Sequence, residues 1–187
     1  MQSDRLKWNE KYATGGSPVE PSAILRDYIG LARPGVALDI AAGMGRNSLF
    51  LTNYGFHVHS VDISDIAMQR LSGLHPHIHP LCADLDRFDI PERRYSLILN
   101  IRYLNRRLFP WIAAGLLPGG VLIFETYVEG SNASIQKPSC RDYWLRKNEL
   151  LHAFLRLHIL FYQEGKIEEE AEESAGALTA SLVAVRR

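Results

Sequence analysis

Apolar and polar residues follow two different periods along this chain, and together the periods predict a repeating order of strands and helices. Short apolar runs bounded by Gly, Pro or charged residues are typical of buried strands, whereas apolar residues three and four apart indicate amphipathic helices. Strands are predicted near residues 36–41, 56–62, 77–83, 95–101 and 119–127. Helices are predicted near residues 20–32, 46–54, 64–73, 105–117 and 146–156.

The last part of the chain departs from this alternation. Residues 157–163 and 178–186 are two strand-like runs joined by a Glu-rich connector without a helical pattern. Two consecutive strands that lack a crossover helix favour antiparallel pairing. The predicted fold class is therefore α/β: a doubly wound Rossmann-like sheet of seven strands, mostly parallel, with helices on both faces and a C-terminal antiparallel hairpin that closes the sheet.

Length and charge restrict the class of protein. The chain has 187 residues, 47% of them apolar, which suits one domain with a substantial core. We expect residues 1–187 to form a single domain, in which residues 21–187 are the core and the polar residues 1–20 are a lid or arm, or else a frayed tail. Lys plus Arg and Asp plus Glu both number 21. This balance gives no support for a nucleic-acid or membrane surface.

Cysteine usage and the first residues favour a cytoplasmic location. Cys82 and Cys140 lie far apart, without a CxxC or zinc-site spacing, and this indicates free thiols in a reducing compartment. The first residues are polar and charged, unlike a signal peptide. No apolar run has the length that a bilayer span requires. We therefore expect no membrane partner.

Residues 36–64 carry the main candidate site. Asp39 lies on the first predicted strand, Gly43 and Gly45 form the turn after it, and Asp62 ends the second strand. Glycines in such a turn admit a ligand close to the backbone, and an acidic strand tip can accept both hydroxyls of a ribose. The helix from about residue 46 offers N–H groups to a carboxylate. The pattern predicts an adenosyl cofactor; a structural turn with two capping aspartates is the alternative.

Two cofactors compete for a turn of this kind. The NAD fingerprint GxGxxG needs a third glycine, and this chain has Ser48 at that place. Asp39 also suits a cationic group better than a pyrophosphate. S-adenosylmethionine carries a sulfonium and an ammonium group, whereas NAD carries phosphates. The charge pattern therefore favours S-adenosylmethionine, with S-adenosylhomocysteine as the product.

At this level of detail the sequence resembles the small class I S-adenosylmethionine-dependent methyltransferases of the tellurite-resistance type. The segments that carry the resemblance are WNEKY at 8–12, LDIAAGMGRNSLFL at 38–51, VDIS at 61–64, CADLDRF at 82–88, YLNRRLFPWIAAGLLPGGVLIFETY at 103–127 and LRKNELLHAF at 145–154. The resemblance implies a methyltransferase that uses S-adenosylmethionine and acts on a small-molecule acceptor. We expect a monomer or a homodimer.

The resemblance assigns the cofactor-binding residues by position. The glycine turn holds the amino-acid half of the cofactor, the second strand tip holds the ribose and adenine, and the ends of the third and fourth strands flank the adenine and the sulfonium. In that order the residues are Asp39, Ala41, Gly43, Gly45 and Asn47; Asp62 and Ile63; Ala83, Asp84 and Leu85; Asn100 and Ile101. For Asp84, a helix or turn cap is the alternative role.

On the acceptor side, the resemblance places Arg46 near the methionine carboxylate or the substrate mouth. Our candidates for positioning the acceptor are Arg46, Tyr103 and Tyr127, and our candidates for substrate contacts or the lid are Trp8, Tyr12 and Arg102. In an in-line methyl transfer the protein mainly aligns the reactants and excludes water. A soft nucleophile needs no general base, in contrast to many alcohols and amines. Each aromatic also fits a core or interface role, and Glu125 fits an ion pair with Arg102 or Arg106.

The sequence differs from related methyltransferases at two places, and both differences restrict the class of methyl acceptor. The fourth strand is followed by NIRYLN and not by an Asn-Pro-Pro-Tyr type of sequence, which argues against the amino-methylating subclass with that motif. The connector EGKIEEEAEESAGA lacks the His-Arg pair of the tellurite-resistance proteins, and its acidity favours a neutral or cationic acceptor over an oxyanion. A non-catalytic S-adenosylmethionine-binding regulator and, less favoured, an NAD-binding protein are the alternative functions.

Five histidines alternate along two predicted strands. They are His57 and His59 on the second strand, and His75, His77 and His79 on the third. If these strands are neighbours, four imidazoles share one face and could recruit zinc or nickel. No carboxylate or cysteine joins them at a suitable spacing. We therefore expect a partly exposed polar face and no metal.

Overall fold

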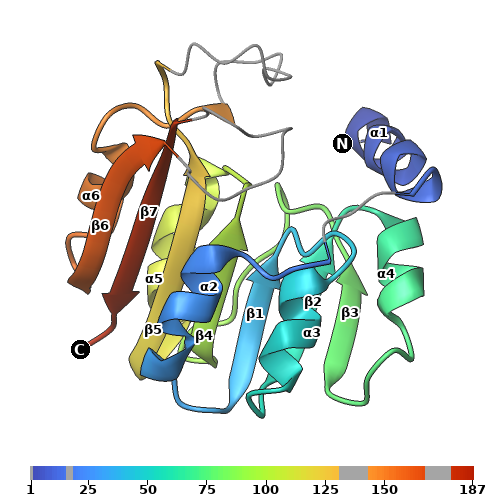
Figure 1. Cartoon of the computed structure of the whole chain (residues 1–187), viewed down its shortest axis with the longest axis horizontal. Helices are drawn as coiled ribbons and strands as arrows, with labels where there is room; N and C mark the ends of the chain where they lie inside the picture. Colours follow the sequence, from blue (N-terminus) through green and yellow to red (C-terminus); the bar gives the residue numbers. More distant parts are fainter. Residues whose placement is uncertain (1, 16–18, 131–142, 167–177) are drawn as a thin grey trace.

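The computed structural model describes residues 2–15, 19–130, 143–166 and 178–187. These residues form a seven-stranded sheet with the order β3-β2-β1-β4-β5-β7-β6 (Figure 1). The strands are β1 (Val36–Ile40), β2 (His57–Asp62), β3 (Ile78–Cys82), β4 (Tyr95–Ile101), β5 (Leu116–Tyr127), β6 (His158–Lys166) and β7 (Leu178–Val185). The first five run parallel, and β7 pairs antiparallel with both β5 and β6. The predicted fold class is confirmed, including its closing hairpin.

Most helices are shorter than their sequence patterns predict. They are α1 (Gln2–Ala13), α2 (Ala23–Tyr28), α3 (Arg46–Thr52), α4 (Asp65–Leu71), α5 (Phe109–Gly115) and α6 (Glu149–Ala153), with 3-10 turns η1 (Ile29–Leu31) and η2 (Arg106–Leu108). Asn148 has φ +60, so α6 begins only after it. Leu116 already pairs with Tyr95, which ends the predicted helix 105–117 early. Among the described residues, no helix has the length and apolar composition needed to cross a membrane.

Alternate residues of the central strands pack into two different cores. Leu38 and Ile98 belong to the core that α5 and α6 complete, while Ala37 and Leu97 belong to the core beneath α2 and α3. All four side chains have no solvent exposure. Strands that are buried on both faces need largely apolar runs, so the buried polar residues Asp39 and Asn100 within β1 and β4 stand out. Helices therefore cover both faces of the sheet, as predicted (Figure 1).

The N-terminal residues form a helix that packs against α4 (Figure 1). The Asn9 amide donates to Asp65 Oδ1 at 2.8 Å and accepts from Ser64 Oγ at 2.7 Å, while Arg5 Nε donates to the Ile63 carbonyl at 3.1 Å. The alternative of a frayed tail is therefore wrong for residues 2–13. The sequence did not predict this helix because its few apolar residues do not gather on one face, and tertiary contacts stabilise it instead.

Candidate functional site

The turn after β1 consists largely of left-handed backbone. Ala41, Gly43 and Gly45 have φ values of +55°, +54° and +78°. A Cβ atom on Gly43 would lie 2.7 Å from Tyr12 Oη, and one on Gly45 would lie 2.2 Å from a Leu71 methyl. Both glycines are thus favoured by conformation, and at Gly45 the Leu71 side chain also leaves no space for a Cβ atom. Ala41 adopts the same conformation at a cost of about 1–2 kcal/mol, a kind of strain that concentrates at functional sites.

Asp62 joins this turn to the tip of β2. One carboxylate oxygen accepts from Gly43 N at 2.8 Å and the other from Ser64 N at 2.9 Å. The side chain is buried; this burial raises its pKa, and the backbone hydrogen bonds oppose the rise. Each oxygen has a further lone pair, so the carboxylate retains acceptor capacity for two hydroxyl groups. The predicted ribose carboxylate therefore lies beside the glycine turn in a fixed orientation.

Asp39 is buried below the same turn. Ser48 Oγ donates to Asp39 Oδ2 at 2.6 Å, and the hydroxyls of Ser48 and Ser60 lie 2.7 Å apart. Burial raises the pKa of Asp39 to about 7; the Ser48 hydrogen bond opposes this rise and the nearby Asp62 carboxylate adds to it. A desolvated carboxylate of this kind is stabilised by a cation. From the sequence, Ser48 was recognised only as the residue that replaces the third glycine of the NAD fingerprint. The one indication of a role for Ser60 was that it is a polar residue within a buried strand.

The remaining candidates in this loop contact the segment before α2. Asn47 is buried, and its Oδ1 accepts from Ser22 N at 2.9 Å. Arg46 Nη1 donates to the Glu20 carbonyl at 3.1 Å. These contacts fix the segment before α2 against the start of α3, next to the glycine turn. Direct contact of Asn47 or Arg46 with a ligand stays a prediction.

The turn after β3 continues the same edge of the sheet. Ala83 N donates to the Asp62 carbonyl at 2.9 Å, which extends the β2–β3 pairing by one residue. Asp84 Oδ1 accepts from Asp86 N at 3.0 Å, and the Asp84 carbonyl accepts from Phe88 N at 2.9 Å. The structure thus gives Asp84 the capping role that was its alternative interpretation. Contact of Asp84 with an adenine amino group stays a prediction.

The tip of β4 is held by its own side chains. Asn100 is buried and donates from Nδ2 to the Tyr103 carbonyl at 2.7 Å. Ile101 is buried next to it, and Arg102 follows in the left-handed region with φ +60. Burial raises the pKa of Tyr103 to about 12, so its hydroxyl stays protonated. The chain therefore turns sharply at the place where the sulfonium was predicted to lie.

An ion pair and two aromatic rings lie at the exits of β4 and β5. Arg102 Nη2 is 3.5 Å from Glu125 Oε1, and Ser181 Oγ donates to Glu125 Oε2 at 2.6 Å. The Arg102 guanidinium also lies 4.9 Å from the centre of the Tyr127 ring, which packs against Trp144 at 5.8 Å. The predicted alternative of an ion pair at Glu125 is confirmed with Arg102. We term these five residues the β4–β5 cluster.

Of the two candidate lid aromatics, Tyr12 reaches the glycine turn. Its ring stacks on Trp8 at 5.6 Å, and the Lys11 ammonium lies 4.9 Å from the centre of the Trp8 ring. Arg70 Nη1 donates to the Tyr12 carbonyl at 2.7 Å. Burial and the nearby Asp62 carboxylate raise the pKa of Tyr12 well above its ordinary value. Helix α1 therefore brings a neutral phenol against the loop where the cofactor is predicted.

The rings of His57, His59, His77 and His79 lie together, as their alternation predicts, but the placement of His75 and His77 on the third strand is wrong because β3 begins only at Ile78. The rings of His57 and His77 are 4.2 Å apart, and those of His59 and His79 are 5.8 Å apart. Within the described ranges, no group of three or more His, Cys, Asp or Glu residues is arranged to hold a metal ion. Cys82 is an exposed free thiol. Cys140 and residues 167–177, which make up most of the acidic connector, lie outside the described residues, whereas residues 164–166 at its start belong to β6.

Comparisons with known proteins agree with this geometry. The profile of the family described as "Tellurite resistance protein TehB" matches residues 8–113. Among solved structures, the chain is similar to TehB from Haemophilus influenzae, with a TM-score of 0.76, 19% identity, and coverage of 96% of this chain and 67% of that one. No curated protein sequence gives a significant match.

Two further structures share the fold. One is an S-adenosylmethionine-dependent methyltransferase from Mesorhizobium loti, with a TM-score of 0.70, 19% identity, and coverage of 90% of this chain and 100% of that one. The other is 1,6-didemethyltoxoflavin-N1-methyltransferase from Burkholderia thailandensis with bound 1,6-didemethyltoxoflavin and S-adenosylhomocysteine. It gives a TM-score of 0.68, 18% identity, and coverage of 98% of this chain and 86% of that one. The arrangement of strands and helices is therefore that of S-adenosylmethionine-dependent methyltransferases.

Proposed function

Because the chain belongs to the TehB family and has the methyltransferase fold, we propose that it transfers a methyl group from S-adenosylmethionine to a small-molecule acceptor by in-line displacement. The family and fold carry the enzyme class and the cofactor, and they confirm the predicted class I methyltransferase of the tellurite-resistance type. The acceptor class, the transfer geometry and the roles of individual residues are our proposal. We also propose a single domain, 1–187, with α1 as its lid.

The observation that carries the proposal is the cradle formed by the glycine turn, Asp62 and Asp39. Asp62 holds the Gly43 amide and retains acceptor capacity for ribose hydroxyls. Asp39 is a buried carboxylate whose pKa is raised mainly by burial and further by Asp62, while Ser48 and Arg46 oppose the rise, so a cationic ligand group beside it would stabilise its ionised form. The ammonium group of S-adenosylmethionine supplies that charge, whereas an NAD pyrophosphate would add negative charge. The cradle therefore suits S-adenosylmethionine better than NAD.

We assign the acceptor side to the β4–β5 cluster. When bound, S-adenosylmethionine supplies an electrophilic methyl group on a sulfonium that becomes a neutral thioether. Tyr127 and Trp144 would pack against an apolar part of the acceptor, and Tyr103 would help to exclude water. Glu125 would accept a hydrogen bond from an N–H or O–H group of the molecule that receives the methyl group. Since Glu125 compensates the charge of Arg102, the cluster favours neutral or cationic acceptors over oxyanions such as tellurite.

Calorimetry with S-adenosylmethionine, S-adenosylhomocysteine and NAD tests the cofactor site. We expect both adenosyl-sulfur ligands to bind and NAD not to bind. Asp62→Asn should weaken S-adenosylhomocysteine binding by about tenfold or more, since hydrogen bonds to charged groups contribute roughly 1.5–3 kcal/mol. Asp27→Asn is the matched control, because Asp27 is an exposed carboxylate on α2. Equal affinities for the two variants, or no binding of either adenosyl-sulfur ligand, would contradict the proposal.

Transfer of labelled methyl groups to thiols, amines, heteroaromatic compounds and metalloid oxyanions tests the acceptor class. We expect turnover with a neutral or cationic member of this panel. Turnover with tellurite alone would contradict the assignment of the β4–β5 cluster. Tight cofactor binding without turnover of any acceptor would support the alternative of a non-catalytic regulator.

A further inference from the structure

One part of the sheet lacks a covering helix among the described residues. Helices α5 and α6 complete the core on one face of β1, β4, β5 and β7, but on that face nothing helical packs over β2 and β3. The reason is the connection between β3 and β4. Residues 83–94 form turns and extended chain without a helix. The same face of β2 and β3 carries the histidines described above.

The connection is joined to β2 at its start by the Ala83 amide, and its later residues are held on the side of α5. Arg107 donates to the Phe88 carbonyl and, at 3.2 Å, to Asp89 Oδ1. The backbone amides of Arg93 and Arg94 donate to carbonyls at the end of α5 at 2.9 and 2.8 Å. A cavity of about 230 Å³ is left between the connection and the sheet, which we term the reverse-face cavity. It is lined by His59, Val61, Leu81, Phe88, Asp89, Pro91, Arg94 and Tyr95.

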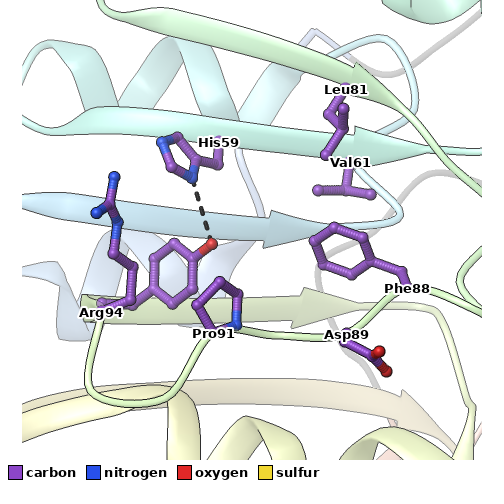
Figure 2. Close-up of a pocket in the computed structure, with 8 residues that line it drawn as sticks. His59, Val61, Leu81, Phe88, Asp89, Pro91 and Arg94 are labelled. Carbon is purple, nitrogen blue, oxygen red and sulfur yellow. Dashed lines mark hydrogen bonds between the residues drawn. The ribbon is translucent and has the colours of Figure 1, made fainter.

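The two ends of the reverse-face cavity differ in chemistry. Figure 2 shows His59 and Arg94 at one end, and Val61, Leu81 and Phe88 toward the other. At the polar end, His59 Nδ1 lies 3.2 Å from the Tyr95 hydroxyl and the two rings meet edge to face at 5.6 Å. At the apolar end, Leu81 is 46% exposed although it lies in a strand. A ligand would cover this side chain.

We propose that the reverse-face cavity binds a small aromatic carboxylate. The guanidinium of Arg94 and the imidazole of His59 supply donors for a carboxylate at one end. Val61, Leu81 and Phe88 supply an apolar site for one ring, and aromatic side chains favour the edge-to-face contacts that a ring can make. The volume is below that of drug-sized pockets, so the ligand is limited to about one ring.

Binding at this site is coupled to proton uptake by His59. Burial lowers the pKa of His59, and the positive Arg94 and the neighbouring His79 lower it further, which favours the neutral imidazole. The other groups around this end of the cavity are Tyr95 on β4 and the remaining histidines of β2 and β3. Asp89 lines the cavity as well and pairs with Arg107. A bound carboxylate offsets the charge of Arg94, so the pKa of His59 rises and affinity increases as the pH falls from 7.5 to 6.

The test is a titration with benzoate, followed by nuclear magnetic resonance of the histidine ring signals. We expect a saturable shift of the His59 signal with a dissociation constant on the order of 1 mM, while the signals of His152 and His158 stay in place. Benzamide, which has the same ring without the charge, should bind about tenfold more weakly. Affinity for benzoate should rise as the pH falls.

Four variants, two of them controls, make the outcome decisive. Arg94→Gln should weaken benzoate binding about tenfold, whereas Arg87→Gln, which removes the same charge from the same connection, should not. Leu81→Trp should abolish binding by filling the cavity, and unchanged backbone spectra show that the variant is folded. Asp62→Asn, which tests the cofactor site, should leave benzoate binding intact. No saturable shift in the folded wild type, equal effects of the two arginine variants, or binding that survives Leu81→Trp would overturn the proposal.

Discussion

The substitution Asp39→Asn should stabilise the ligand-free protein at pH 8.5, and its effect on the free energy of unfolding should become more favourable as the pH rises. Burial raises the pKa of Asp39 from its ordinary value of 3.8 to about 7 in the folded protein. The folded state therefore holds a proton that the unfolded chain has released, and the free energy of unfolding falls as the pH rises between these values. At about 1.4 kcal/mol per pKa unit, the loss is about 2 kcal/mol at pH 5.5 and about 4 kcal/mol at pH 8.5.

Asparagine at this position removes the pH dependence because it does not ionise. Its amide can still accept the hydrogen bond from Ser48, but the buried NH₂ group offsets roughly 1–3 kcal/mol of the gain at every pH. This cost is the same at both pH values, so it cancels when the stabilisation at pH 5.5 is subtracted from the stabilisation at pH 8.5. We expect the stabilisation to be about 2 kcal/mol larger at pH 8.5 than at pH 5.5, which corresponds to roughly 4–8 °C in melting temperature for a chain of this size.

Urea unfolding of both proteins at the two pH values measures this difference, and calorimetry with S-adenosylhomocysteine measures its functional cost. The variant should bind the ligand at least tenfold more weakly, because the buried carboxylate no longer faces the ammonium group. A gain in stability combined with a loss of binding is expected of residues kept for function. A stabilisation that is equal at both pH values, or larger at pH 5.5, would refute the link between burial and the pKa of Asp39.

Three further predictions concern the backbone, the lid and the acceptor site. Gly120→Ala should lower the free energy of unfolding, measured in urea, by about 2 kcal/mol or more, because the new Cβ atom would lie 2.8 and 2.9 Å from two backbone oxygens. Gly30→Ala is the control: no atom lies near its new Cβ, so the free energy of unfolding should change by less than about 1 kcal/mol. Asn9→Ala removes the bonds of α1 to Ser64 and Asp65, and stopped-flow fluorescence should show several-fold faster release of S-adenosylhomocysteine; unchanged release contradicts a lid. Glu125→Gln should reduce kcat/KM for a neutral acceptor about tenfold or more while leaving cofactor affinity unchanged.

The sequence predicted those parts of the site that depend on local chemistry. Gly43 and Gly45 are needed wherever the backbone turns with positive φ, and Asp62 is recognisable because an acidic residue ends an otherwise apolar strand. The closing hairpin was predictable because its two strand-like runs have no helical segment between them. These features follow from neighbours in the chain, so no tertiary information was required.

The features that the sequence did not predict depend on contacts between distant residues. Helix α1 has no apolar face, and its position is determined by hydrogen bonds to the β2–α4 turn. The choice of Arg102 over Arg106 as partner of Glu125 depends on the left-handed turn at Arg102, while Arg106 instead bonds to Glu149 at 2.9 Å. The hydroxyl pair of Ser48 and Ser60 forms only when α3 packs on β2. Composition and spacing contain no signal for such pairings.

The place of β7 between β5 and β6 has a consequence for biosynthesis. Residues 178–185 complete both antiparallel ladders at once, yet they leave the ribosome after every other strand of the sheet. Until then β5 presents an open edge and β6 has no partner, a state in which nascent chains are prone to pair with the wrong strand. A premature stop before Leu178 would remove both ladders and detach β6, although β6 itself would be synthesised in full. Assembly of this edge of the sheet therefore depends on β7, the strand of the sheet that comes last in the sequence.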